Sequence, residues 1–155
     1  KIASTADPTR KMSKSAGEKH WIGVFADEKR MTKQIKSAVT DAGDMPFNQE
    51  TGKREMSAGV TNLLQLLKAC GKAKEHDEIV DLYHEGSLRY GDLKGIVAEA
   101  IVEMTTPFRE RKAELLADKK AVKNQIKASS AEIRKTAQQT LREVKEITGL
   151  LNVKA

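Results

Sequence analysis

The sequence predicts a mainly α fold, and a bundle of helices is the simplest architecture for it. Apolar residues recur every three or four positions along most of the chain. No segment alternates with a period of two, and clusters of β-branched residues are sparse. Helices that each carry one apolar face bury those faces against one another, so these patterns together favour a bundle.

The first predicted helix covers residues 27–40 and follows a loop. Residues 1–20 are polar and rich in Lys, Ser, Thr and Gly, a composition typical of a loop. Asp27 is suited to cap the helix, because its carboxylate can accept hydrogen bonds from free backbone N–H groups of the first turn. Met31 and Ile35 then begin an apolar face at helical spacing.

Two shorter helices are expected in the middle of the chain. Residues 43–59 are polar and show no steady period, so they predict a loop or an extended linker. A helix over residues 58–69 ends before Gly71, and one over residues 75–85 ends before Gly86. Glycine is common directly after a helix, because it tolerates the left-handed backbone conformation there.

The last part of the sequence predicts two long helices. Apolar residues recur from Leu93 to Leu115, but Pro107 lies inside this stretch. An interior proline removes one backbone hydrogen bond and clashes with the preceding turn, so we expect a kink or a break near Thr105 and Thr106. The final helix is expected over residues 119–148.

The charge of the chain is compatible with binding to nucleic acid or polyphosphate. Lys and Arg number 28 against 22 Asp and Glu, which gives a formal net charge of +6. A well-solvated helical surface would explain the same excess, so charge alone decides nothing. No stretch approaches the roughly 20 apolar residues needed to cross a bilayer, and we expect a soluble protein.

The cysteine and histidine residues of the sequence indicate neither a disulfide nor a metal site. Cys70 is the single cysteine, which excludes an internal disulfide and a cysteine-cluster metal site and fits a reducing cytosol. His20, His76 and His84 share no ligand spacing. We therefore predict no metal site in the chain.

Residues Lys11–Ser15 read KMSKS, the signature of class I aminoacyl-tRNA synthetases. Four further segments resemble the bacterial-type tryptophanyl branch of that class. They are DEKRMTKQIKSAVTD at 27–41, GVTNLL at 59–64, YGDLKGIVAEAIVEM at 90–104 and TLREVKEITGLL at 140–151. The Tyr-Gly-x-Leu-Lys stretch is not expected in the tyrosyl branch, so another class I synthetase is disfavoured.

The sequence departs from the family pattern at two places. After Ser15 the family commonly continues with an acidic or Asn-rich turn, whereas this chain continues AGEKHWIGVF. This difference affects the resting conformation of the loop rather than its chemistry. The stretch KASSAEIRKTA also lacks a glycine that the family often places there.

The resemblance implies two domains and a fragment. Residues 1–22 would supply the KMSKS loop from the end of a Rossmann-like catalytic domain, and residues 23–155 a helical anticodon-binding domain. The sequence contains no His-Ile-Gly-His-like motif and starts at Lys1 without an initiator Met, so we expect a C-terminal part that is inactive by itself. The complete ligase would be a cytoplasmic homodimer that uses ATP with Mg²⁺, tryptophan and tRNA(Trp).

The resemblance also assigns chemistry to the signature. Lys11 and Lys14 would stabilise the negative charge that develops on pyrophosphate when tryptophan attacks the α-phosphate of ATP. Ser13 and Ser15 would donate hydrogen bonds to phosphate oxygens or hold the loop in shape, and Met12 would make a packing contact. All five residues are candidates for ATP binding.

Basic residues beyond the signature are candidates for tRNA binding. They are Lys29, Arg30, Lys33 and Lys36 on the first helix and Arg109, Arg111 and Lys112 after Pro107. Each of them also fits a solvated helix face. A stand-alone helical RNA-binding or scaffold protein without ATP chemistry therefore stays the alternative, although such a module has no use for a phosphate-closing loop.

Overall fold

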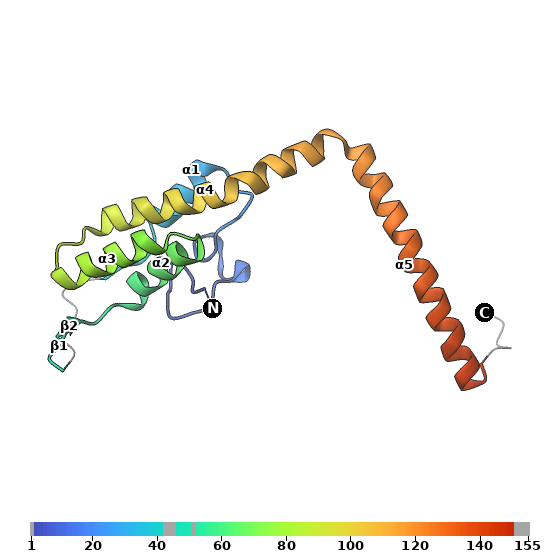
Figure 1. Cartoon of the computed structure of the whole chain (residues 1–155), viewed down its shortest axis with the longest axis horizontal. Coiled ribbons are helices and arrows are strands. Elements are labelled where there is room, and N and C mark those ends of the chain that lie inside the picture. The colour runs from blue at the N-terminus through green and yellow to red at the C-terminus, as the bar shows by residue number, and fades with distance from the viewer. Residues whose placement is uncertain (1, 42–45, 51, 151–155) are drawn as a thin grey trace. The chain divides into compact units, whose positions relative to one another are not determined.

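The protein is mainly helical, as the apolar period predicts (Figure 1). A computed structural model describes residues 2–41, 46–50 and 52–150. The chain forms two compact units, Lys1–Arg109 and Glu110–Ala155, which are described separately. Among the described helices, none combines the length and the apolar character that a membrane span requires.

The helices of the first unit begin and end close to the expected residues. They are α1 (Glu28–Lys36), α2 (Ala58–Ala69), α3 (Ala73–Glu85) and α4 (Tyr90–Ala117), which continues into the second unit.

The predicted cap of α1 is confirmed, but its predicted end is wrong. The Asp27 carboxylate accepts a hydrogen bond of 2.8 Å from the backbone N–H of Arg30. The helix ends at Lys36 rather than at residue 40. The Val39 N–H, which a continuing helix would direct at the Ile35 carbonyl, donates instead to the Thr5 carbonyl at 2.9 Å. A contact with the start of the chain therefore ends this helix.

A short hairpin lies within the segment that the sequence predicted to be irregular. Strand β1 (Phe47–Asn48) pairs antiparallel with β2 (Lys53–Arg54), with Phe47 opposite Arg54. Strands of two residues are too short to show a period of two, so no pattern in the sequence predicts them. Residues 43–45 and 51 of the predicted linker lie outside the described residues.

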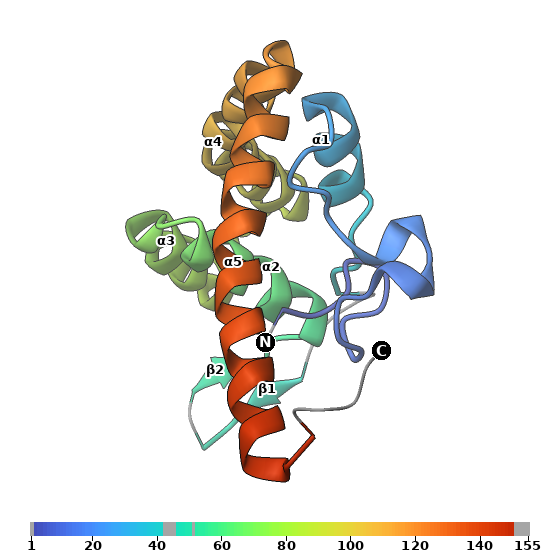
Figure 2. The same ribbon diagram turned by 90° about the vertical axis from the view of Figure 1, so that its right-hand side faces the viewer.

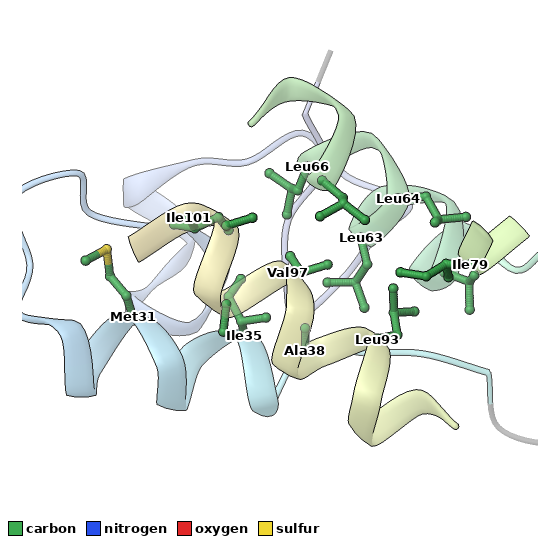
Figure 3. Packing of buried hydrophobic residues seen from close by; sticks show 14 of the residues in the cluster. Met31, Ile35, Ala38, Leu63, Leu64, Leu66, Ile79, Leu93, Val97 and Ile101 are labelled. Carbon is green, nitrogen blue, oxygen red and sulfur yellow. The ribbon is translucent and has the colours of Figure 1, made fainter. Parts of the chain in front are cut away.

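The core of the first unit lies where four helices meet (Figure 3). Helix α1 runs beside α4 in both ribbon views (Figures 1 and 2), and Met31 and Ile35 of α1 are fully buried. The other large aliphatic residues with almost no exposure come from α2, α3 and α4 and are Val60, Leu63, Leu64, Leu67, Ile79, Leu93, Val97 and Ile101. Each lies on the apolar face that the sequence period predicted.

A glycine allows α2 to approach the segment that follows α1. A Cβ atom at Gly59 would lie 2.5 Å from the carbonyl oxygen of Val39, closer than real Cβ atoms approach such an atom. The two backbones therefore meet without a side chain between them, and α2 is seated at its N-terminal end by this contact.

Pro107 does not interrupt α4, so of the kink or break expected near Thr105 and Thr106 the break is wrong, while the kink stays a prediction. The Thr105 hydroxyl donates to the Ile101 carbonyl at 2.7 Å, and the Thr106 hydroxyl donates to the Val102 carbonyl at 2.8 Å. The Arg109 guanidinium then donates to both threonine oxygens at 2.8 Å. These bonds link side chains around Pro107 to carbonyls one turn earlier and to one another, and the helix continues through the proline.

The second unit contains the end of α4 and the helix α5 (Lys119–Thr148). The Asp118 carboxylate caps α5 by accepting a 2.8 Å hydrogen bond from the Ala121 N–H, and Gly149 ends the helix in the left-handed conformation. Both ends agree with the sequence prediction. None of the α5 side chains is buried, although they include a stripe of apolar residues.

We expect Gly59→Ala to destabilise the protein by about 1–3 kcal/mol, because the new methyl group must displace backbone at Val39. Gly95→Ala in α4 is the matched control, since a Cβ there meets no atom within 4 Å. The control should gain about 0.5–1 kcal/mol from helix propensity. Urea denaturation of the two variants measures both effects, and equal stability of the pair would contradict the close approach.

Candidate functional site

The signature segment is tied to the start of the chain by a backbone bridge. Ala3 and Lys11 form an antiparallel bridge. The Ser4 N–H donates to the Arg10 carbonyl at 2.9 Å, and the Met12 N–H donates to the Ile2 carbonyl at 3.2 Å. Residues 2–12 thus form a closed turn from which the signature emerges.

The tip of this turn is held by the Asp7 side chain. The Thr9 hydroxyl donates to Asp7 Oδ1 at 2.6 Å and the Thr9 backbone N–H donates to the same oxygen at 3.2 Å. The side-chain bond from Thr9 is the main reason that the pKa of Asp7 is lowered. Charge on Asp7 therefore stabilises this turn at neutral pH.

Asn62 fastens the turn to the helical core. Its side chain is 4% exposed and lies on α2. Its Oδ1 accepts a 3.0 Å hydrogen bond from the Ala3 N–H, and its Nδ2 donates to the carbonyls of Ala3 and Ser4 at 3.2 and 3.3 Å. One buried amide thus satisfies three backbone groups of the N-terminal segment.

Two buried hydroxyls join this segment to the residues that follow the signature. Ser4 Oγ lies 2.8 Å from His20 Nδ1, and the Thr5 hydroxyl donates to the Lys19 carbonyl at 2.7 Å. Ser4 and Thr5 are 1% and 2% exposed. The signature is therefore held at both of its ends while the residues between them remain accessible.

Within the signature, the two lysines are exposed and the residues between them shape the loop. Lys11 and Lys14 are solvent-exposed, whereas Met12 is half-buried, in keeping with a packing contact. Ser13 Oγ lies 2.8 Å from Ser15 Oγ, so the two hydroxyls hold each other across a single turn of 3₁₀ helix that starts at Lys14. Two mobile ammonium groups on an anchored loop suit a polyphosphate ligand.

The Lys14 ammonium lies over the ring of Trp21, with 4.9 Å between Nζ and the ring centroid. The Gln34 side-chain amide on α1 donates to the Trp21 carbonyl and, at 3.1 Å, to the Glu18 carbonyl. A shallow hollow of about 450 Å³ lies here, lined by Lys14, Trp21, Phe25, Arg30 and their neighbours. The segment that departs from the family pattern thus contacts the signature directly.

The basic candidates on α1 share one accessible face. Lys29, Lys33 and Lys36 are all exposed and are spaced at one and two helical turns. Arg30, in contrast, pairs with Glu18 at 3.2 Å. The three lysines therefore form the exposed basic face of α1.

The candidates after Pro107 are differently placed. Arg109 has a side chain only 18% exposed, and besides the two threonines it contacts Glu28 on α1 at 2.9 Å. Its donors are thus engaged inside the first unit. Arg111 and Lys112 belong to the second unit, where Arg111 pairs with Glu114 at 2.8 Å.

The described residues offer no cluster of three or more His, Cys, Asp or Glu side chains able to hold a metal. Cys70 is half-buried directly after α2, and burial raises the pKa of its thiol. A raised thiol pKa means little thiolate at neutral pH, which fits a structural role.

Sequence reasoning missed the residues that position the loop. Asn62 carried a readable signal, because it is a polar residue in the apolar run of α2. Ser4 and Thr5 carried none, since short hydroxyl side chains in a polar loop are ordinary. Trp21 stands in the stretch AGEKHWIGVF that departs from the family pattern, and nothing in the local sequence indicates its contact with Lys14.

Comparisons with known proteins agree with the signature. Residues 1–106 match the sequence family described as tRNA synthetases class I (W and Y). The tryptophan–tRNA ligase of Porphyromonas gingivalis is 36% identical over 143 residues, which are 92% of this chain and 42% of that protein. The tryptophan–tRNA ligase of Wolinella succinogenes is 34% identical over 153 residues, which are 97% of this chain and 44% of that protein.

Solved structures show the same relation. A tryptophanyl-tRNA synthetase from Campylobacter jejuni aligns with a TM-score of 0.70 at 27% identity and covers 94% of this chain and 44% of that one. The same enzyme complexed with ADP and tryptophan also gives 0.70, at 26% identity and with 96% and 44% covered. This chain therefore spans less than half the length of these relatives.

We expect Asn62→Leu to destabilise the protein by about 1–3 kcal/mol, because backbone groups of Ala3 and Ser4 lose their buried partner. Hydrogen exchange should also accelerate at the amides of Ser4 and Met12, which pair within the turn. Gln65→Leu, at an exposed position of the same helix, should leave both measurements near wild type. Unchanged exchange in Asn62→Leu would mean that the turn is held by other contacts.

Proposed function

The chain belongs to the class I tRNA synthetases of the tryptophan and tyrosine group, and we propose that it is the C-terminal part of a tryptophan–tRNA ligase. In the complete ligase the tryptophan carboxylate attacks the α-phosphate of ATP, which yields tryptophanyl-adenylate and releases pyrophosphate. The activated acyl group then passes to the terminal ribose of tRNA(Trp). We further expect a homodimer in the cytoplasm, as the family resemblance implies.

The observation that carries this proposal is the anchored signature. Lys11 and Lys14 present two ammonium groups on a loop whose ends are held by Ala3, Asn62 and Thr5. Such a loop can bring positive charge to pyrophosphate as its negative charge develops, which lowers the barrier more than it strengthens ground-state binding. Ser13 and Ser15 hold the loop in shape. A scaffold without ATP chemistry explains none of these features.

Each of the two predicted domains has its own role in the proposed function. Residues 1–22 belong with the catalytic machinery, and residues 23–155 bind the tRNA. The exposed lysines of α1 supply phosphate contacts, whereas Arg109 acts mainly inside the protein by joining α4 to Glu28. Arg111 and Lys112 add positive charge in the second unit. Phosphate contacts of this kind give affinity without base specificity.

We predict that Lys14→Ala in the full-length ligase lowers the turnover of ATP–pyrophosphate exchange by about 10²–10³-fold. The Michaelis constant for ATP should change much less, because the charge partner of Lys14 appears mainly as pyrophosphate departs. Lys19→Ala, at an exposed lysine just outside the signature, is the control and should keep near wild-type turnover. A variant that raised only the Michaelis constant would show that Lys14 binds ATP without assisting the reaction.

For the chain by itself, we predict no aminoacylation and weak binding to tRNA(Trp) that falls steeply with salt. Replacing Lys29 and Lys33 together by Gln should reduce the slope of log affinity against log salt by about two. The same change at Lys68 and Lys74, two exposed lysines of α2 and α3, is the matched control. Titrations with tRNA(Trp) and an anticodon-altered variant at several salt concentrations measure this. Affinity indifferent to both salt and anticodon would remove the anticodon-binding assignment.

A further inference from the structure

The side chain of the signature lysine Lys14 lies over the aromatic ring of Trp21. Its Nζ lies 4.9 Å from the centroid of the Trp21 ring. An ammonium within about 6 Å of an aromatic centroid is attracted by the negative face of the ring, and Trp is the strongest such partner. The resting position of Lys14 is therefore a stabilised one.

Trp21 is itself held in place from two directions. The Gln34 amide on α1 fixes its backbone by donating to the Trp21 carbonyl. The ring lies against the backbone of Gly23, because a Cβ there would come within 3.1 Å of the ring atom Cζ3. The ring is thus braced against the polypeptide rather than free to follow Lys14.

The Trp21 ring and the phosphates of a bound ligand compete for the same Lys14 ammonium group. Movement of the Lys14 ammonium toward phosphate oxygens would draw it away from the ring, and the attraction to Trp21 would then be lost. That attraction stabilises the resting enzyme but not the transition state, so it opposes turnover. The segment around Trp21 is also where the chain departs from the common family pattern.

We propose that Trp21 is a positioning residue that retains Lys14 in a resting position, from which Lys14 departs only as pyrophosphate forms. This inference rests on the function proposed above. Trp21 contacts neither substrate nor reacting atoms in this role, and it acts only through Lys14.

The resting contact can be observed directly in this chain. Trp21 is its single tryptophan, so no other indole contributes to a ring-current shift. The ε-methylene protons of Lys14 should resonate upfield of those of the exposed lysines, and Trp21→Leu should return them to the common position. Lys14 protons without an upfield shift in the wild-type chain would overturn the proposal.

The catalytic consequence is tested by pyrophosphate exchange in the full-length ligase. Trp21→Leu should raise kcat about two- to five-fold, the range of an exposed cation–π contact, with the Michaelis constant for ATP unchanged. Trp21→Phe keeps an aromatic face and should fall between Leu and wild type. In a Lys14→Ala background the same Trp21→Leu change should have no effect, because the interaction partner is gone.

The outcomes separate this proposal from the function on which it rests. Suppose that the full-length ligase exchanges pyrophosphate normally. If Trp21→Leu leaves the exchange unchanged or slows it, or if its effect is equal with and without Lys14, the positioning role alone is overturned. A full-length protein without exchange activity would overturn the proposed function and this inference with it. If circular dichroism shows that Trp21→Leu does not fold, Trp21→Phe and its double variant with Lys14→Ala decide the same question. Trp21→Phe should then raise kcat by less than is expected for Leu, and only when Lys14 is present.

Discussion

The backbone of Val39 is the junction on which the first unit depends. Its N–H donates to the Thr5 carbonyl, and its carbonyl oxygen lies where a side chain at position 59 would have to be. The first contact ends α1 and holds the N-terminal segment, while the second lets α2 approach. The absence of a single Cβ atom at Gly59 thus sets the distance at which the loop, α1 and α2 meet.

From this junction, contacts of different chemistry connect the core to the signature. Apolar packing seats α1, α2 and α4, but it fixes no direction for the loop, because burial of apolar surface is not directional. Direction comes from Asn62 and Thr5, whose hydrogen bonds fix individual backbone groups, and from Ser4, whose hydroxyl bonds the His20 ring. The polar contacts therefore position the site, and the apolar contacts support them.

The helices could be predicted from the sequence far better than the positions of the site residues. Helix α5 was predicted to the residue, because a long amphipathic pattern with Gly149 after it combines two strong local signals. The expected break at Pro107 is wrong, because α4 continues through the proline, and a rule based on one residue takes no account of the side chains that bond around it. The β1–β2 hairpin was too short to show any period.

Within the site, the signature identified the residues that are proposed to meet the ligand, but not those that hold them in place. Lys11 and Lys14 belong to a five-residue motif that can be read locally. Asn62 and Val39 act on the loop from positions far along the chain, and contacts between distant residues leave no periodic trace in a single sequence. The pairing of Lys14 with Trp21 depends on how the loop turns between them, which composition does not specify.

The Asn62 contact also has a consequence for the order in which the protein forms. Ala3 and Asn62 are separated by 59 positions, so the signature segment leaves the ribosome long before its anchor. Chains emerge at about 5–20 residues per second, which leaves the segment without its helical partner for several seconds. Its own bridge between Ala3 and Lys11 spans only a short stretch and can close meanwhile. The loop can thus assemble locally before α2 is available to hold it.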